Sequence, residues 1–306
     1  MYKFNRLLVC LDLSNHDQQM LAVTKQIVEH LGADDVYLLH IAEDLQVPEE
    51  LLKKFPDLIA PVDETLMREL QLNAETVFGK NPNCTIHYEI KEGNRTDTIL
   101  KWAKIKEVDL LLMGRKPYTE SSGVISEKIA KVCHCSMLLV PAGATKMTIK
   151  KILVPTDFSK SSKMAIEQSL VIAEKRGATV TCHHSCKVPP GYHVTGKTYE
   201  EFAAIMQQHS ARDFDKMIKK IGSRAQGIKC IYTLDQYIHP AEDTYKHAKE
   251  NGFDMIVMGS RGRTGISSVL LGSIACKLIR INYDIPLLIV KDKFDNMGIM
   301  GAILKI

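Results

Sequence analysis

A glycine-rich loop over residues 258–273 has the spacing that points most clearly to chemistry: Gly259, two residues, Gly262, nine residues, then Gly272 and Ser273. Glycines can adopt positive φ and let backbone N–H groups approach a ligand closely. The start of a helix offers unpaired N–H groups and the positive end of a dipole to an anion. The pattern therefore predicts a cradle for phosphate. Two arginines add positive charge to the same loop: Arg261 and Arg263.

Each of these residues also has a purely structural interpretation. Gly259 and Gly262 could form a tight turn between a strand and a helix without any ligand, and the two arginines could be solvated loop charges. Asp157, which follows an earlier strand, could bind a ligand or shape a turn, whereas Ser159 is expected to cap the next helix. The ligand interpretation of Asp157 is favoured because its strand and the strand before the glycine loop are expected to end at the same edge of a sheet.

The chain repeats itself, and the repeat sets its domain organisation. Three segments of the first half return in order in the second: RLLVCLDLS as KILVPTDFS, VDLLLMG as FDMIVMG, and CSMLLV as IPLLIV. The offset is about 145 to 150 residues and aligns Asp12 with Asp157. A repeat of this length indicates two homologous domains. We predict domains at residues 1–145 and 146–306, joined by a linker near residues 142–150.

Within each half, short apolar runs alternate with longer segments of helical period. Such alternation predicts an α/β fold with a parallel sheet covered on both faces, in which ligands bind at the carboxyl ends of the strands. Strands are expected at residues 6–11, 35–41, 84–90, 108–113 and 135–140 of the first half, and at 151–156, 179–185, 228–234, 253–258 and 286–291 of the second. Helices of the second half are expected at residues 161–176, 198–222, 240–250 and 269–281.

Composition excludes several classes of protein. The chain has 306 residues, 45% of them hydrophobic and 25% charged, which is enough apolar material for the cores of two domains. A formal net charge of +4 does not indicate a nucleic-acid-binding protein. No apolar run is long enough to predict a membrane span, and the first residues lack the layout of a signal peptide. The eight cysteines form no C-x-x-C pair, so a reducing, cytoplasmic location is expected.

These features together resemble the universal stress protein family, and the chain looks like two such domains in tandem. The resemblance covers residues 1 to about 292. It rests on the complete G-x2-G-x9-G-[S/T] pattern of the second half and on PTDFS at residues 155–159. It implies two doubly wound domains, each with a five-stranded parallel sheet of order 3-2-1-4-5. It also implies a stress-response protein that binds ATP, with or without Mg²⁺, in its second domain.

The resemblance also assigns roles to individual residues. It places Thr156 beside the adenine and Asp157 at the ribose. The backbone of Ser185 would hold the edge of the adenine, and Gly259 would lie beside the sugar. The phosphates would be bound by three further residues of the loop: Gly262, Gly272 and Ser273.

The first half departs from this pattern. Pro117 stands where Gly262 would be, the loop is about four residues shorter before Gly123, and Val124 replaces the hydroxyl of Ser273. Proline removes a backbone donor as well as flexibility. Asp12 is retained, but the preceding Pro-Thr becomes Cys-Leu. We therefore expect the first domain to have lost nucleotide binding and to act as a partner surface.

Two clusters of cysteine and histidine raise the possibility of a zinc site. The first is CHHSC at residues 182–186, and the second is Cys133-His134-Cys135. Neighbouring residues of a strand alternate between its faces, which would point the ligands of the first cluster apart. A core or site-lining role is therefore expected for His184, and the second cluster is the weaker metal candidate. No metal site is predicted.

Three functions remain open. The first is an ATP-binding stress-response module whose nucleotide occupancy changes its shape or partners. The second is a slow ATPase or another nucleotide-handling enzyme; P-loop, dinucleotide and G-x-S-x-G patterns are absent, and no catalytic residue is predicted. The third is a structural or interaction protein without a nucleotide. Nucleotide that co-purifies with the protein would favour the first two, and slow release of ADP would favour the second.

The assembly expected is an intrachain pseudo-dimer, in which the last strands of the two halves pair and cover each other's exposed edges. A homodimer is also open, and protein partners are unknown. Two proline-containing insertions, residues 45–62 and 187–197, could carry partner or ligand contacts. The apolar tail at residues 297–306 is expected to pack on its own chain.

Overall fold

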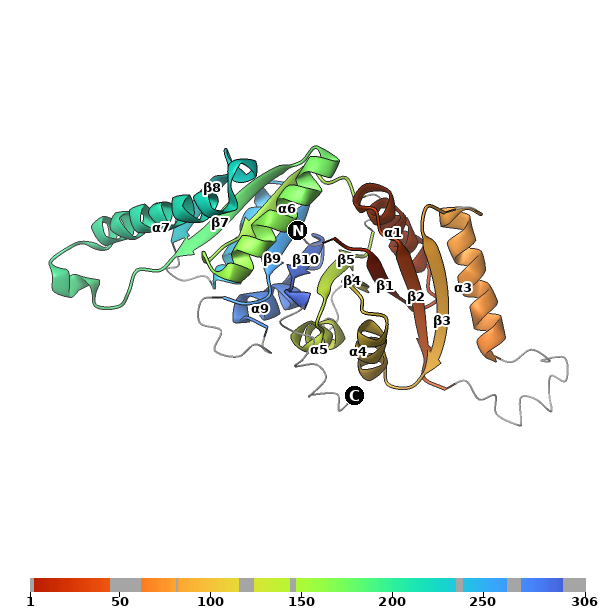
Figure 1. Ribbon diagram of the computed structural model, residues 1–306. Helices are drawn as coiled ribbons and strands as arrows, with labels where there is room; N and C mark the ends of the chain where they lie inside the picture. Colours follow the sequence, from red (N-terminus) through yellow and green to blue (C-terminus); the bar gives the residue numbers. More distant parts are fainter. Residues whose placement is uncertain are drawn as a thin grey trace.

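The strands of both halves form one continuous sheet in the computed structural model (Figure 1). The structure describes residues 3–44, 62–80, 82–115, 124–143, 147–234, 239–262 and 271–293. Within these residues, no helix is both long and apolar enough to cross a membrane. The order of the ten strands is β3-β2-β1-β4-β5-β10-β9-β6-β7-β8.

The first half alternates strands and helices as expected. Its strands are β1 (Arg6–Leu11), β2 (Asp35–Ala42), β3 (Thr85–Glu92), β4 (Leu110–Arg115) and β5 (Ser136–Pro141). Its helices are α1 (Asp17–Leu31), α3 (Val62–Phe78), α4 (Arg95–Ile105) and α5 (Val124–Val132).

The second half repeats this order. Its strands are β6 (Lys151–Pro155), β7 (Thr179–Cys186), β8 (Lys229–Leu234), β9 (Met255–Gly259) and β10 (Leu287–Val290). Its helices are α6 (Lys160–Arg176), α7 (Tyr199–Ile221), α8 (Pro240–Glu250) and α9 (Ser273–Ile281), with short 3-10 turns η1 (Tyr192–Thr195) and η2 (Ser223–Ala225). The last predicted helix began too early: Leu271 and Gly272 are not helical, because Gly272 is the N-cap of α9.

Each half has the predicted strand order 3-2-1-4-5, and the two halves meet at their fifth strands. Within a half the described strand pairs are parallel, but β5 and β10 are antiparallel, with Leu138 opposite Leu288. The predicted pairing of the last strands within one chain is therefore confirmed. Because the two central strands run in opposite directions, the carboxyl ends of the two domains' strands lie at opposite edges of the combined sheet.

The sheet is buried on both faces, as a parallel sheet requires. Leu7 and Leu8 are neighbours on β1 and point to opposite faces, yet both are 0% exposed. One face packs against α1, α3, α6 and α7, and the other against α4, α5, α8 and α9. Each face has one cluster of buried apolar residues that runs through both domains.

A pair of aspartates at equivalent positions fixes the amino ends of the strands. Asp109 Oδ2 accepts the N–H groups of Asn5 and Arg6 at 3.0 and 2.9 Å. Asp254 Oδ2 does the same for Lys150 and Lys151, both at 2.8 Å. Asp254 therefore has a structural role at the edge of the second domain opposite to the predicted ligand site.

Candidate functional site

The described residues of the predicted phosphate site meet at the carboxyl ends of the strands in the second domain's sheet. Thr156 and Asp157 follow β6, Gly259 ends β9, and Gly272 and Ser273 begin α9. Arg263 lies outside the described residues. So do Pro117 and Gly123 of the first-half loop, residues 45–61 of the first insertion, and the tail from residue 294.

Gly259 is required by the packing of the strand against α6. A Cβ at this position would lie 2.6 Å from the backbone carbonyl of Ser161, which leaves no room for a side chain. Ser161 also supports the loop directly, since its Oγ accepts the N–H of Arg261 at 3.2 Å. Gly259, Gly262 and Gly272 do not use the freedom of glycine to adopt positive φ. Close approach is the reason for Gly259.

Gly262 and Asp157 are in direct contact. A Cβ on Gly262 would lie 2.9 Å from Asp157 Oδ2. The other carboxylate oxygen of Asp157 accepts the N–H of Ser159 at 3.1 Å, so Asp157 also shapes the turn after β6. The structural interpretation of Asp157, as a residue that shapes a turn, is therefore confirmed.

Gly272 differs from the other two glycines because the described residues leave room for a Cβ beside it. The nearest atom to a Cβ here would be Ser260 O at 3.6 Å, an ordinary contact. Its N–H donates to the same oxygen at 2.8 Å, which closes the base of the loop. Gly272 is the N-cap of α9, and no side chain of the described residues caps this helix. Ser273, its first residue, is exposed.

Hydroxyl groups hold the turn between β6 and α6. Thr156 Oγ1 accepts the N–H of Phe158 at 3.1 Å and donates to Ser162 Oγ at 3.1 Å. Phe158 has a φ of 65°, a left-handed conformation that this turn stabilises. Ser159 Oγ accepts the N–H of Ser162 at 3.2 Å and caps α6, as predicted. Sequence reasoning missed Ser161 and Ser162.

The two histidines of β7 point to different faces and are hydrogen-bonded within the protein. His184 Nδ1 bonds Thr156 O at 2.7 Å, and its ring packs on Phe158 with centroids 4.5 Å apart. His183 bonds the hydroxyls of Thr244 and Thr233 at 3.2 and 3.1 Å, and burial lowers its pKa to about 4. Beyond them, Ser185 Oγ is buried without a hydrogen-bond partner among the described residues.

The second cysteine cluster is the more compact of the two. The ligand atoms of Cys133, His134 and Cys135 lie within 4.8 Å of one another, and the segment is buried. A bend between α5 and β5 brings the three side chains together. No local sequence pattern predicts this bend.

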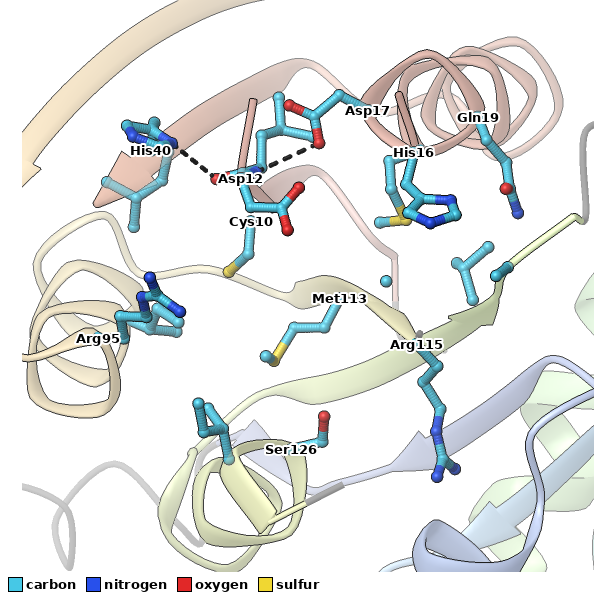
Figure 2. Close-up of a pocket in the computed structure, with 18 of the residues that line it drawn as sticks. Cys10, Asp12, His16, Asp17, Gln19, His40, Arg95, Met113, Arg115 and Ser126 are labelled. Atoms are coloured by element: carbon cyan, nitrogen blue, oxygen red, sulfur yellow. Dashed lines mark hydrogen bonds between the residues drawn. The ribbon is translucent and has the colours of Figure 1, made fainter. Parts of the chain in front are cut away.

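The first domain contains a cavity of about 450 Å³ at the corresponding carboxyl edge of its own sheet (Figure 2). It lies between the ends of β1, β2, β4 and β5 and the helices α1, α4 and α5. Asp12 and Asp17 lie on the side of β1 and α1, whereas Ser126 and the guanidinium of Arg115 lie on the opposite side (Figure 2). Sequence reasoning did not anticipate this cavity, which needs the side chains of three helices to define it.

Asp17 takes the place that Ser162 has in the second domain. Its carboxylate accepts the N–H groups of Asp12 and Leu13 at 3.2 and 2.8 Å, and the residue is 3% exposed. Leu13, with a φ of 56°, is the equivalent of Phe158. Burial raises the pKa of Asp17 to about 6, so the carboxyl is mainly ionised at neutral pH. The first domain therefore has two carboxylates where the second has one carboxylate and hydroxyls.

Comparison with known proteins agrees with this architecture. A universal stress protein from Methanocaldococcus jannaschii is 32% identical over 142 residues, 46% of this chain and 82% of that protein. A universal stress protein E homolog from Haemophilus influenzae is 24% identical over 300 residues, 89% of this chain and 93% of that protein.

Solved structures show the same fold over the whole chain. A universal stress protein from Archaeoglobus fulgidus has a TM-score of 0.60 at 17% identity, over 95% of this chain and 99% of its own. A functionally unknown protein from Pseudomonas aeruginosa has a TM-score of 0.68 at 13% identity, over 99% of this chain and 97% of its own. The sequence model of the universal stress protein family matches residues 3–141 and 148–291. The chain therefore belongs to the universal stress protein family, with two such domains in tandem.

Proposed function

We propose that this protein binds one molecule of ATP in its second domain and acts as a nucleotide-dependent stress-response module. The first domain would then be a partner surface. The observation that carries the proposal is the contact between Gly262 and Asp157, which joins the phosphate loop to the turn after β6. Two segments far apart in the sequence thus lie together at the carboxyl ends of the strands, where ligands bind in α/β sheets, and this supports the proposal.

The proposed roles follow the family resemblance, residue by residue. Thr156 lies beside the adenine, Asp157 contacts the ribose, and the backbone of Ser185 holds the adenine edge. The triphosphate, with or without Mg²⁺, rests on the loop and on the uncapped start of α9, where N–H groups and the helix dipole favour an anion. Its contacts would come from Gly259, Arg261, Gly262, Arg263, Gly272 and Ser273.

Gly272 provides a separate argument for a ligand at the loop. Because the described residues leave room for a Cβ at this position, their packing alone does not require glycine. A ligand that approaches the backbone of the loop closely would require it.

The proposal is for binding rather than catalysis. Asp254 holds the amino end of β6, at the opposite end of the strands from the proposed site. Asp157 Oδ1 is engaged in the turn. Neither arrangement provides a general base directed at a γ-phosphate.

The test is to purify the protein, identify any bound nucleotide by mass, and titrate the nucleotide-free protein with ATP. We expect ATP to co-purify or to bind, and Gly272→Val to abolish binding while the protein stays folded. Absence of binding at millimolar ATP would refute the proposal. Release of ADP over hours that Gly272→Val abolishes would show that the protein is an enzyme instead.

A further inference from the structure

The bend between α5 and β5 forms a compact set of metal-ligating atoms. Cys133 and Cys135 place their sulfur atoms 3.2 Å apart, and His134 contributes a ring nitrogen within 4.8 Å of both. The three residues are 1%, 0% and 0% exposed. Thiolate sulfur and imidazole nitrogen are ligands that soft and borderline metal ions prefer. The segment therefore offers a closed set of two sulfurs and one nitrogen.

Lys291, which follows β10 of the second domain, places a buried positive charge beside this set. Its Nζ donates to the carbonyl oxygens of Ala130 and Cys133 at 2.5 and 2.6 Å, and the residue is 6% exposed. Both partners are neutral, and the described residues give this amine no carboxylate partner. A buried charge without a countercharge is costly. A negative charge in the cluster would remove that cost.

Net charge distinguishes between classes of metal. Two thiolates with a monovalent ion carry one negative charge, which Lys291 neutralises. The same ligands with a divalent ion are neutral and would leave the buried ammonium uncompensated. The number of donors favours the same class, because structural zinc sites use four ligands. Lys293, a second cation nearby, is already paired with Asp109, with Nζ and Oδ1 2.6 Å apart.

We propose that Cys133, His134 and Cys135 form a binding site for a soft monovalent metal ion of the Cu(I) class, with Lys291 as its countercharge. Both thiols lose their protons on binding, and the imidazole binds as the neutral ring. The ligands come from the first domain and the countercharge from the second. The bound ion therefore ties β10 to the segment between α5 and β5.

The test uses the reduced full-length protein, titrated anaerobically with Cu(I) in competition with the chelator bathocuproine disulfonate. We expect one Cu(I) per chain. Cys133→Ala or Cys135→Ala should lower the affinity at least about tenfold, the range known for disturbed metal sites. Cys182→Ala is the matched control, since Cys182 is also 0% exposed, and it should leave Cu(I) affinity unchanged.

Lys291→Met keeps all three ligands and provides a second test if a cysteine variant does not fold. It should weaken Cu(I) binding and strengthen Zn²⁺ binding, because the buried positive charge is gone. Two results would overturn the proposal: equal Cu(I) affinity in the wild type and both cysteine variants, or tighter binding of Zn²⁺ than of Cu(I) by the wild type.

Discussion

At the carboxyl ends of their strands, the two domains have the same backbone geometry but different side chains. Both have an aspartate after the first strand, followed by a residue with positive φ, Leu13 in one domain and Phe158 in the other. In the second domain, hydroxyls satisfy the N–H of this turn. In the first domain, the carboxylate of Asp17 does so. A repeat can thus keep the geometry of a turn while changing its charge.

The glycine that ends the fourth strand shows the same divergence. A Cβ on Gly259 would lie 2.6 Å from the backbone of Ser161, whereas a Cβ on Gly114 would lie 3.4 Å from the flexible side chain of Met20. The carboxyl ends of the first domain's strands also line a cavity of about 450 Å³. The comparison shows that backbone excludes a side chain at residue 259, whereas only a flexible side chain faces one at residue 114.

The largest expected difference concerns these two glycines. Gly259→Ala should lower the free energy of unfolding by about 1–3 kcal/mol, because the new methyl group meets backbone that cannot move aside. Gly114→Ala should cost less than about 1 kcal/mol, because the Met20 side chain can shift. Urea denaturation of both variants measures the difference. Equal losses would show that the two edges are packed alike.

Exchanging the charge of the turn should alter ligand binding. Ser162→Asp gives the second domain the carboxylate that the first domain has at Asp17. A second negative charge beside Asp157 should reduce ATP affinity about tenfold, which is about 1.4 kcal/mol. Calorimetric titration with ATP measures the effect, with circular dichroism as the control for folding. Unchanged affinity in a folded variant would mean that this charge does not distinguish the domains.

The pH dependence of stability should report the buried carboxyl of the first domain. Its folded pKa of about 6 lies above the ordinary value of 3.8, so the folded state holds the proton more tightly than the unfolded state. Asp17 should therefore lower stability as pH rises from about 4 to about 6, with no further change above that range. Asp17→Asn should remove this contribution. Urea denaturation across this range gives the slope of the free energy of unfolding against pH. Identical slopes in the wild type and in Asp17→Asn would contradict this prediction.

The smallest effect is expected at an ion pair away from both edges, which serves as a reference. Glu127 on α5 accepts from Arg280 on α9 at 2.5 and 2.9 Å, and this interaction holds the pKa of Glu127 at about 2. Its contribution is present above the ordinary pKa of 4.5 and is lost as pH falls towards 2. Because Arg280 is largely exposed, Glu127→Gln should cost only about 1 kcal/mol near neutral pH. Guanidinium chloride would screen the pair, so urea is the denaturant for this measurement.

Much of the fold could be predicted, because the period of apolar residues indicates which positions are buried and the repeat indicates two similar domains. β1 and α8 have the predicted bounds, and the order of strands followed from the resemblance. The start of α9 could not be read correctly, since the apolar residues before Gly272 look helical in sequence. The contacts of Gly259 with Ser161 and of Gly262 with Asp157 could not be predicted, because they depend on segments far away in the chain.

The site was less predictable than the fold. The glycine spacing located the loop, but the supporting hydroxyls of Ser161 and Ser162 have no signal of their own. Asp17 reads as an ordinary first-turn residue of a helix, and only the structure shows its carboxylate bound to the turn before it. The Cys133–Cys135 cluster depends on a bend that local sequence does not indicate. Side-chain environments of this kind arise from packing between elements and not from local pattern.

The most direct test of the central claim is a calorimetric titration of nucleotide-free protein with ATP, in the wild type and in Gly272→Ala and Gly114→Ala. The described residues leave room for a methyl group at residue 272, so a loss of affinity there is expected to report the ligand and not the packing. We predict one ATP per chain, bound about tenfold more weakly by Gly272→Ala and with unchanged affinity by Gly114→Ala. Two ATP molecules per chain, or a loss caused by Gly114→Ala alone, would contradict the account.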